Sequence, residues 1–439
     1  MSTIHAPRAR RRSHASKEVA PPPRPAKPLS VLVVGRGVVP IKVGCGGAEL
    51  AMYQLSKCIG IVGHRVTVVG DVVEDDFPPT PELRIVPLGG RLHRLASRLP
   101  NGFFGWLIKH FVGNVASALA ARRLLRRESF DVVHAHGNLG ALLLPRFTRV
   151  PVVYTEHDST PWSCRYRTWY ERLIRRAIYR AVNVAAYRRV SSIATTCEAL
   201  REELVGRFGI DEARVRTILN GADFDVFNPD VGASEDAVKT PFRRYCLFVG
   251  RLTPRKAADL LLRALAEAPL VNCVFAGDGP ERRKLAELAK TLGVDDRVAF
   301  VGDVAPRNLA PLYAGADLLV IPSFSETTPL VAFEAMACGT PVLSSRVAGL
   351  PDVVDDWMTG FLIKPGDVGQ LAIAMRFLTA DREALQRMGE EAQKRVRKRF
   401  LWPNVARQYL ELFHTLVPAT PAAAAPVAEA VPNAIAAVA

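Results

Sequence analysis

The stretch that defines the architecture of this chain reads DLLVIPSFSETTPLVAFEAMACGTP, from Asp317 to Pro341. It begins with a short apolar run, passes through a polar loop, and continues as a segment with helical composition. A buried strand followed by a loop and a covering helix is the repeating unit of a parallel α/β sheet. The loop holds Glu326 and the expected helix holds Glu334, so two carboxylates lie near the end of one strand.

The ends of this helix are predicted from its flanking residues. Thr328 predicts the N-cap and Pro329 the first helical position, while Gly339 predicts the end after about three turns. The N-terminus of the helix would therefore open beside Glu326. Unpaired backbone N–H groups there favour a phosphate, and the carboxylates suit the hydroxyls of a sugar or ribose. The alternative is a buried αβ unit in which Glu326 is only a loop charge.

Length and composition indicate two globular domains. The chain has 439 residues, 49% of them apolar and 23% charged, which is enough for two substantial cores. Its net charge of +15 is compatible with nucleic acid, anionic lipid or phosphorylated substrates as partners. Seven scattered cysteines favour a reducing cytoplasm. No uninterrupted apolar run reaches about 18 residues, so no membrane-spanning helix is expected.

Short Val-, Ile- and Leu-rich runs alternate with helical patterns along most of the chain, which is typical of doubly wound parallel sheets. The predicted strands are residues 30–35, 65–69, 83–87, 131–135, 150–154, 191–194 and 215–219, and then 245–249, 272–276, 298–301, 317–321, 341–344 and 360–363. A polar segment separates the two sets, so we expect an α/β protein of two Rossmann-like domains facing across a cleft.

The expected divisions of the chain follow from this pattern. They are a disordered basic and Pro-rich arm (residues 1–27), a first Rossmann-like domain (28–228), a linker (229–241), a second Rossmann-like domain (242–400), a C-terminal helix that packs back on the first domain (401–416) and a disordered Ala/Pro-rich tail (417–439).

Three strand ends in the second half carry glycines or charges. Gly250, Arg251 and Lys256 follow the first of these strands, Gly277 follows the next, and Glu326 follows the fourth strand of the set, residues 317–321. The carboxyl ends of parallel strands meet at one edge of a sheet. Two cations and free N–H groups at that edge could hold a diphosphate.

In the first half, Gly46 and Gly47 precede an amphipathic segment, where glycines let the backbone approach a ligand closely. His136 and His157 each follow a predicted strand and are expected to face the cleft. A dinucleotide-binding fingerprint after the first strand is the alternative. It fits poorly, because Pro40 stands where the third glycine would fall.

The segment from Arg165 to Arg189 has two different sides. Apolar residues such as Tyr170 and Leu173 gather on one side of a helix, and arginines such as Arg172 gather on another. A surface helix with a solvated basic side is one interpretation, and contact with an anionic membrane surface is the other. Nucleic-acid binding is not expected, because no known reading module accompanies the charge. The expected location is the cytoplasm, with peripheral attachment to the inner face of the cell membrane under the second interpretation.

As a set, these motifs resemble the retaining GT-B glycosyltransferases of glycosyltransferase family 4. The resemblance runs from about Pro28 to Leu416 and is most specific in the second domain. The matching pieces are Gly46-Gly47-Ala48-Glu49, Asp131-Val132-Val133-His134-Ala135-His136, Asn220-Gly221-Ala222-Asp223, Gly250-Arg251 with Lys256, Gly277-Asp278-Gly279-Pro280, and the pair Glu326 and Glu334 continuing to Cys338-Gly339-Thr340-Pro341-Val342.

The resemblance implies transfer of a hexose-type sugar from a nucleotide-diphosphate sugar to a glycan or lipid-linked acceptor. The second domain would bind the donor and the first domain the acceptor, with retained anomeric configuration and without a metal or cofactor. The implied catalytic residues are His136, Arg251, Lys256 and Glu326, and the implied substrate-binding residues are Gly46, Gly47, His157, Asn220, Gly277, Thr327, Thr328, Pro329, Leu330 and Glu334.

Individual roles are implied in the same way. Arg251 and Lys256 would neutralise the diphosphate, and Glu334 would hold the ribose hydroxyls. Glu326, with the N–H groups of the two threonines after it, would orient the sugar, and His136 would lie near the transferred sugar and the acceptor. Gly46 and Gly47 would close on the phosphates.

This chain departs from the family at two positions. Ala257 and Thr327 stand where the family usually or often has glycine. The second substitution lies in the loop that would face the sugar, so the identity of the donor stays open. Two other functions also stay open on the same architecture, namely nucleotide-sugar epimerisation and non-catalytic nucleotide-sugar binding.

Overall fold

The computed structural model describes residues 27–36, 46–70, 81, 83–88, 103–157, 169–230 and 238–417. Most of the predicted arm, the tail after residue 417 and part of the predicted linker lie outside these ranges. So do Pro40, which decided against the dinucleotide fingerprint, and Arg165, where the predicted basic segment begins.

A seven-stranded parallel sheet forms the centre of the first domain within the described residues. Its strands are β1 (Ser30–Val34), β2 (Arg65–Val69), β3 (Leu83–Val86), β4 (Val132–Ala135), β5 (Val152–Glu156), β6 (Ser192–Thr195) and β7 (Val215–Thr217). The spatial order is β3-β2-β1-β4-β5-β6-β7. The order changes direction between β1 and β4, and ligands of such sheets bind beyond the carboxyl ends of strands at this point.

The second domain repeats the arrangement with a six-stranded parallel sheet in the order β10-β9-β8-β11-β12-β13. Its strands are β8 (Cys246–Val249), β9 (Cys273–Ala276), β10 (Val298–Gly302), β11 (Leu318–Ile321), β12 (Val342–Ser345) and β13 (Gly360–Ile363). Each predicted strand is found, with ends that lie within about two residues of the predicted ones. The prediction of two Rossmann-like parallel-sheet domains is confirmed.

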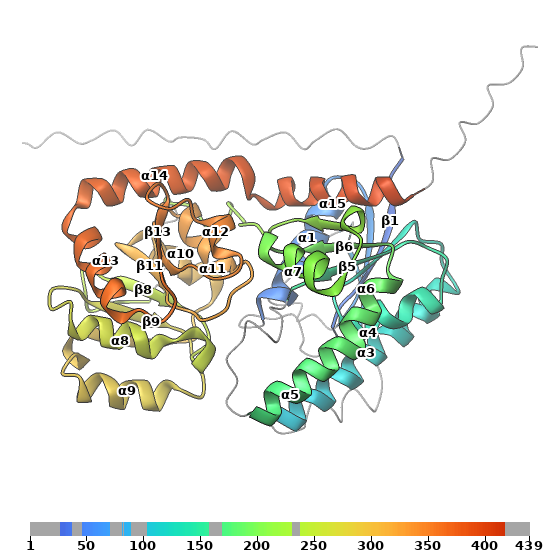
Figure 1. The fold of residues 1–439 in the computed structure, drawn as a ribbon. Coiled ribbons are helices and arrows are strands. Elements are labelled where there is room, and N and C mark those ends of the chain that lie inside the picture. Colours follow the sequence, from blue (N-terminus) through green and yellow to red (C-terminus); the bar gives the residue numbers. More distant parts are fainter. Residues whose placement is uncertain are drawn as a thin grey trace, which may run out of the picture.

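Helices connect the strands and surround both sheets (Figure 1). In the first domain they are α1 (Gly47–Ile61), α3 (Phe103–Leu125), α4 (Asn138–Leu143), η1 (Leu144–Arg146), α5 (Trp169–Ile178), the π-helix η2 (Tyr179–Val184), α6 (Ala185–Arg189), α7 (Glu198–Phe208) and η3 (Glu212–Arg214). In the second they are η4 (Pro254–Lys256), α8 (Ala258–Ala266), α9 (Arg282–Thr291), η5 (Asp295–Arg297), α10 (Pro306–Ala314), α11 (Leu330–Ala337), α12 (Leu350–Val353), α13 (Val368–Ala380) and α14 (Arg382–Arg399).

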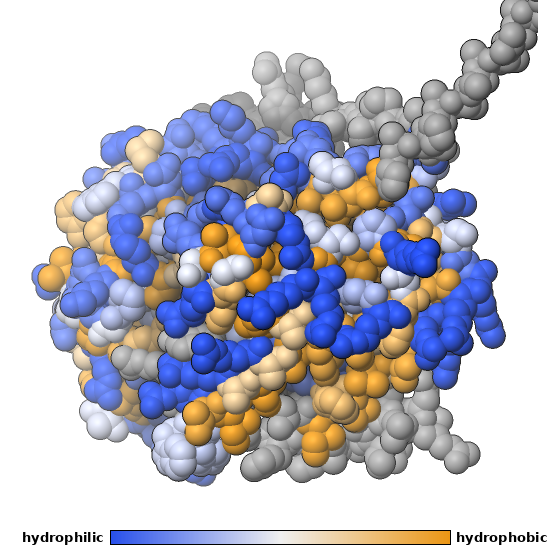
Figure 2. Space-filling view, turned by 45° about the vertical axis from the view of Figure 1, so that its right-hand side comes forward, coloured by the Kyte–Doolittle hydropathy of each residue, from blue (hydrophilic) through white to orange (hydrophobic). Residues whose placement is uncertain are grey.

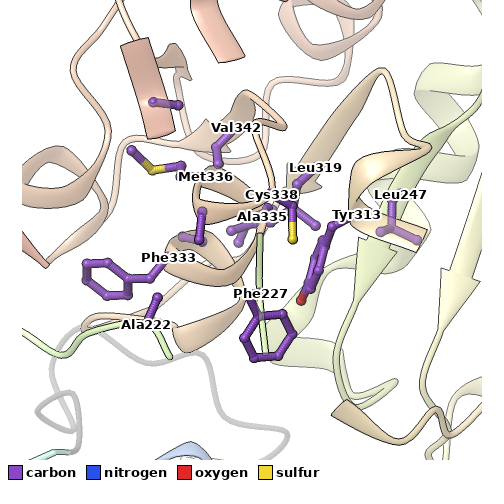
Figure 3. Close-up of a cluster of buried hydrophobic side chains, with 14 of the residues drawn as sticks. Ala222, Phe227, Leu247, Tyr313, Leu319, Phe333, Ala335, Met336, Cys338 and Val342 are labelled. Atoms are coloured by element: carbon purple, nitrogen blue, oxygen red, sulfur yellow. The ribbon is translucent and has the colours of Figure 1, made fainter. Parts of the chain in front are cut away.

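Alternate residues of the strands feed the cores on the two faces of each sheet. Leu319 of β11 packs in one cluster with α10 and α11, whereas its neighbours Leu318 and Val320 pack in another with α8 and α13. This is the period of two that a strand buried on both faces requires. Figure 3 shows Phe333, Ala335 and Met336 of α11 beside Leu319 and Val342. The helix that carries Glu334 is therefore fixed by the core beneath it.

The last helix, α15 (Trp402–Leu416), returns to the first domain. Its buried residues Trp402, Tyr409 and Phe413 share a core cluster with the strands and α1 of that domain. Figure 1 shows α14 along the second domain and α15 continuing across the first. The chain thereby crosses between the domains a second time, and the two crossings touch each other where Ala222 N donates to Phe400 O over 2.8 Å.

The predicted boundaries of the glutamate-bearing helix were wrong at its start. The helix α11 begins at Leu330, with Pro329 at the N-cap, and has eight residues rather than about three turns. Thr328 does not cap it, because its hydroxyl accepts a hydrogen bond from Asn220 Nδ2 at 3.0 Å instead. The predicted end is confirmed, since Gly339 follows the helix with a left-handed φ of 80°.

Candidate active site

A buried ion pair joins two of the predicted site residues. Lys256 Nζ lies 2.6 Å from Glu326 Oε1, and the two side chains are only 17% and 7% exposed. Burial alone would raise the pKa of Glu326, but the positive charges of Lys256 and Arg255 outweigh it and bring that pKa below its ordinary value. Glu326 is thus an ionised carboxylate. Its pairing holds the Lys256 ammonium group at the end of β11.

The turn that delivers Lys256 is strained. Ala257, which follows it, is fully buried and has a φ of 53°, in the left-handed region. Glycine adopts this conformation without cost, whereas a residue with a Cβ pays roughly 1 to 2 kcal/mol. A glycine at position 257 would adopt this turn without strain, and the alanine of this chain adopts it at a cost in stability.

Two glycines bring neighbouring loops of the second sheet into backbone contact. Gly250 and Gly277 follow the adjacent strands β8 and β9, with φ values of 146° and 131°. A Cβ on Gly277 would lie 2.2 Å from the carbonyl oxygen of Gly250, so no other residue fits there. Arg251 is exposed on this loop, and a Cβ on Gly250 would lie 3.8 Å from Lys256 Cε. The glycines therefore place both predicted cations at one edge.

Glu334 lies in a different electrostatic environment from Glu326. Tyr313 of α10 donates a hydrogen bond to Glu334 Oε2 over 2.8 Å, and the Glu334 residue is 7% exposed. Burial raises the pKa of Glu334 to about 7, although the hydrogen bond from Tyr313 opposes the shift. Protonated and ionised forms of this carboxyl therefore coexist near neutral pH.

Histidines gather at the carboxyl ends of β4 and β5 in the first domain. His136 Nδ1 lies 2.8 Å from His157 Nε2, and His134 Nε2 lies 2.7 Å from Thr155 Oγ1. Burial lowers the pKa of His136 well below its ordinary value, and neighbouring histidines and Arg36 add to this. His136 is thus a neutral imidazole that can donate through one nitrogen and accept through the other. Its Nε2 atom has no hydrogen-bond partner among the described residues.

The loop after β11 binds the first domain directly. Thr327 Oγ1 donates to the His157 carbonyl oxygen over 2.9 Å, and Asn220 Nδ2 donates to the Thr328 carbonyl oxygen over 2.9 Å. Leu330 belongs to the core cluster of the first domain, and a Cβ on Gly47 would lie 3.9 Å from it. We call residues 326–330 the bridging loop, because it contacts groups of both domains.

The second side of the bridging loop is packed against Gly349. The Gly349 N–H donates to the Glu326 carbonyl oxygen over 3.2 Å. A Cβ on Gly349 would lie 1.9 Å from the Thr327 carbonyl oxygen and 2.6 Å from Cys197 Cβ of the first domain. Only glycine allows these three segments to meet.

The structure thus brings most of the predicted site residues together through hydrogen bonds, an ion pair and close packing. Lys256, Glu326, Thr327, Thr328, Leu330, Gly47, Asn220, His157 and His136 form one connected set, with Pro329 inside the bridging loop and Gly277 against the loop of Gly250. Gly46 is the N-cap of α1. Among the described residues, no hydrogen bond or ion pair joins Arg251 or Glu334 to this set.

Several supporting residues were not predicted from the sequence. Tyr313 orients Glu334, Arg255 contributes charge to Glu326, and Tyr409 of α15 lies 3.0 Å from Thr155 Oγ1. Arg255 lay next to Lys256 and could have been included from its position. Tyr409 is 254 residues away from Thr155 along the chain, and no local pattern connects them.

The described part of the chain contains neither a metal-binding cluster nor a disulfide bond. No cluster of three or more His, Cys, Asp or Glu side chains there could hold a metal ion. The five cysteines within it are free thiols. None of its helices is both long and apolar enough to cross a bilayer.

Comparison with known families finds two matches that together span both domains. The family model described as Glycosyltransferase Family 4 matches residues 45–226, and the model described as Glycosyl transferases group 1 matches residues 235–395. The D-inositol 3-phosphate glycosyltransferase of Mycobacterium tuberculosis is 34% identical in an alignment 362 residues long, and the match covers 76% of this chain and 71% of that protein.

Solved structures show the same fold. Sucrose-phosphate synthase from Thermosynechococcus elongatus has a TM-score of 0.73 and 26% identity, with 88% of this chain and 98% of that chain covered. Anabaena HepE, solved in complex with UDP-glucose, has a TM-score of 0.64 and 20% identity, with 88% and 100% covered. The second likeness concerns the fold alone, which is the GT-B arrangement of two Rossmann-like domains.

Replacing Glu334 by Gln should change how stability depends on pH. The pKa of Glu334 is raised from 4.5 to about 7 in the folded chain, so the folded state binds more protons between these values. The free energy of unfolding should therefore fall as pH rises through this window, by about 3 kcal/mol from this group. Chemical denaturation at several pH values should show that fall in the native chain and not in Glu334→Gln. Replacing the exposed Glu383 by Gln is the control, and an unchanged slope in Glu334→Gln would contradict the prediction.

Replacing Gly349 by Ala should destabilise the chain and displace the bridging loop. The new Cβ overlaps the Thr327 carbonyl oxygen, and relief of such overpacking typically costs about 1 to 3 kcal/mol. Gly369→Ala is a matched control, because the nearest atom to its Cβ is 3.8 Å away, at the far end of the Asp367 side chain. Denaturation midpoints should fall for Gly349→Ala only. Equal midpoints in the two variants would refute the close packing.

Proposed function

This chain is a glycosyltransferase that belongs to glycosyltransferase family 4, and we propose the following reaction for it. It transfers a hexose-type sugar from a nucleotide-diphosphate sugar to a glycan or lipid-linked acceptor, with retention of anomeric configuration and without a metal. The observation that carries this proposal is the buried pair of Lys256 and Glu326 at the end of β11. It supplies a fixed cation and a fixed carboxylate within one hydrogen bond of each other.

The diphosphate of the donor is proposed to lie against Lys256 and Arg251. When the bond from the sugar to the diphosphate breaks, negative charge grows on the leaving phosphate oxygen. An ammonium group already held in place stabilises that charge without reorganisation. Two side-chain cations can thereby do what a metal ion does in other transferases. The UDP-glucose complex of Anabaena HepE is consistent with a uridine donor on this fold.

The two carboxylates are proposed to bind different hydroxyl groups. Glu334 holds the ribose, because its carboxyl is fixed by Tyr313 on one oxygen. Glu326 orients the sugar together with the backbone N–H groups of Thr327 and Thr328. The two acids also differ in charge, since the pKa of Glu326 is lowered by Lys256 and Arg255 whereas burial raises the pKa of Glu334 to about 7.

His136 is proposed to contact the transferred sugar from the first domain. Its buried Nε2 atom has no partner among the described residues, so a sugar hydroxyl would satisfy it. A neutral imidazole suits this task, because it hydrogen-bonds a hydroxyl without adding positive charge near the anomeric carbon. The related proteins are named for D-inositol 3-phosphate and for sucrose phosphate, so the names of similar proteins refer to different sugar phosphates and polyol phosphates.

One assay distinguishes sugar transfer from the two alternative functions. A nucleotide-sugar epimerase would convert the donor with no acceptor present, and a non-catalytic binding protein would release no nucleotide at all. A thermal-shift screen of nucleotide sugars identifies the donor first. Release of nucleotide that depends on an added acceptor then supports transfer.

Removing the two cations should abolish most of the transfer. Lys256→Ala removes a charge-assisted contact, which lowers kcat/KM by about 10- to 100-fold, and the double variant with Arg251→Ala should lose on the order of a hundredfold or more. Arg263→Ala, an exposed cation on α8, is the control. Because Glu326 would lose its buried partner, unfolding is measured in parallel. Undiminished transfer by the folded double variant would disprove the assignment.

Thr327→Val should lower turnover without unfolding the chain. Valine keeps the branched shape but cannot donate to the His157 carbonyl oxygen, and one hydrogen bond of about 1 kcal/mol corresponds to roughly fivefold in rate. The effect should appear mainly in kcat, because the bond positions the histidine pair relative to the donor loop. Thr327→Ser keeps the hydroxyl and should restore the rate. Identical kinetics for the valine, serine and native chains would rule out this role.

A further inference from the structure

The helix α5 leaves large apolar side chains exposed. Trp169 is 72% exposed, Leu173 is 60% exposed and Tyr170 is 44% exposed. Trp169 and Leu173 are four residues apart and share one side of the helix, with the exposed Arg172 beside them. The sequence left two interpretations open, namely a surface helix with a solvated basic side and contact with an anionic membrane surface. In the structure, apolar and basic groups lie on the same exposed side.

The helix α3 also leaves apolar side chains exposed. Ile108, Phe111 and Leu119 are 47%, 58% and 42% exposed, and their spacing places them along one stripe of the helix. Figure 1 shows α3 and α5 in the lower part of the first domain, and α4 packs against both α3 and η2, which continues α5. Figure 2 shows apolar side chains along the lower edge of the molecule, bordered by hydrophilic ones.

A buried hydrogen-bond network holds α5 in place. The helix continues through the π-helix η2 into α6, and this continuation turns Tyr179, Asn183 and Tyr187 inward. Tyr187 Oη and Asn183 Nδ2 donate to Glu156 Oε2 over 2.6 and 3.0 Å, and Tyr179 Oη lies 2.6 Å from Tyr187 Oη. The exposed half of α5 is therefore presented in a fixed orientation.

We propose that the exposed side of α5, together with the apolar stripe of α3, docks on the surface of an anionic lipid bilayer. Trp and Tyr at the boundary of an apolar patch suit the headgroup region, where an indole or phenol is half buried. Arginine stems lie along the apolar surface while their guanidinium groups reach lipid phosphates. This surface lies on the first domain, outside the connected set of site residues, so the proposal does not rest on the proposed reaction.

The excess of positive charge on this segment favours an anionic bilayer, rather than an unspecified protein, as the partner. Residues 169–189 hold six arginines and one acidic residue, Glu171. An anionic leaflet attracts such a segment, and the attraction falls with salt. A nucleic acid would use the arginines but would leave Trp169 and Leu173 uncovered.

A second exposed apolar patch on the other domain provides a matched control. Trp357, Met358, Ile373 and Phe377 are each more than half exposed. However, residues 355–377 hold three acidic and two basic residues, so this patch has no excess of positive charge. If exposed apolar area alone drove membrane binding, both patches would contribute.

The test is flotation of the full chain with vesicles of phosphatidylcholine alone, or mixed with phosphatidylglycerol. The native chain should float with the mixed vesicles and not with the neutral ones, and added salt should release it. Trp169→Ala with Leu173→Ala, and separately Arg172→Glu with Arg180→Glu, should each reduce the bound fraction by about tenfold. Ile373→Ala with Phe377→Ala should not change it. All of these side chains are exposed, and thermal unfolding checks that the variants fold.

Three results would overturn the proposal. Equal flotation with neutral and mixed vesicles, or none with either, would remove the anionic bilayer as partner. Loss of flotation only in the Ile373 and Phe377 variant would move the contact to the second domain. Salt-sensitive binding to single-stranded RNA without any flotation would assign the arginines to nucleic acid instead.

Discussion

The bridging loop, residues 326–330, is the constraint on which the arrangement of the two domains depends. Its first residue is paired with Lys256 of the second domain, and its next two residues are hydrogen-bonded to His157 and Asn220 of the first. The loop can satisfy all of these groups only when the domains are close together. The loop therefore holds the carboxyl end of β11 close to the histidine pair of the first domain.

Three buried titratable groups in this region carry different charges for different physical reasons. Glu326 is ionised because two cations offset its burial, whereas Glu334 has only the hydroxyl of Tyr313 and its pKa rises to about 7. His136 is neutral because burial and neighbouring basic groups oppose its protonation. A fixed anion, a titrating acid and a neutral imidazole are thus obtained from ordinary side chains by burial and by the choice of neighbour. Such separation of pKa values is typical of active sites.

The strands and the order of motifs could be predicted from the sequence, because apolar runs and glycines are local signals. The start of α11 could not, since Thr328 is engaged by Asn220, which is 108 residues away. The same limit applies to the contacts around His134. Its hydrogen-bond partner Thr155 is also hydrogen-bonded to Tyr409, which lies near the other end of the chain. Helical periodicity placed Leu173 on an apolar side of its helix, but it could not show that this side stays exposed. Local sequence patterns therefore predict helices and strands, whereas contacts between distant residues determine which side chains are buried, hydrogen-bonded or exposed.

The two residues that depart from the pattern of the resemblance have different physical consequences. Ala257 adopts a left-handed φ that glycine would adopt without strain, so it costs stability. Thr327 adds a hydroxyl that glycine lacks, and that hydroxyl ties the bridging loop to the His157 carbonyl oxygen. A glycine at position 327 would leave the loop freer to move, because neither a Cβ nor a hydrogen bond would restrict it. The threonine therefore holds the bridging loop in one orientation against the first domain.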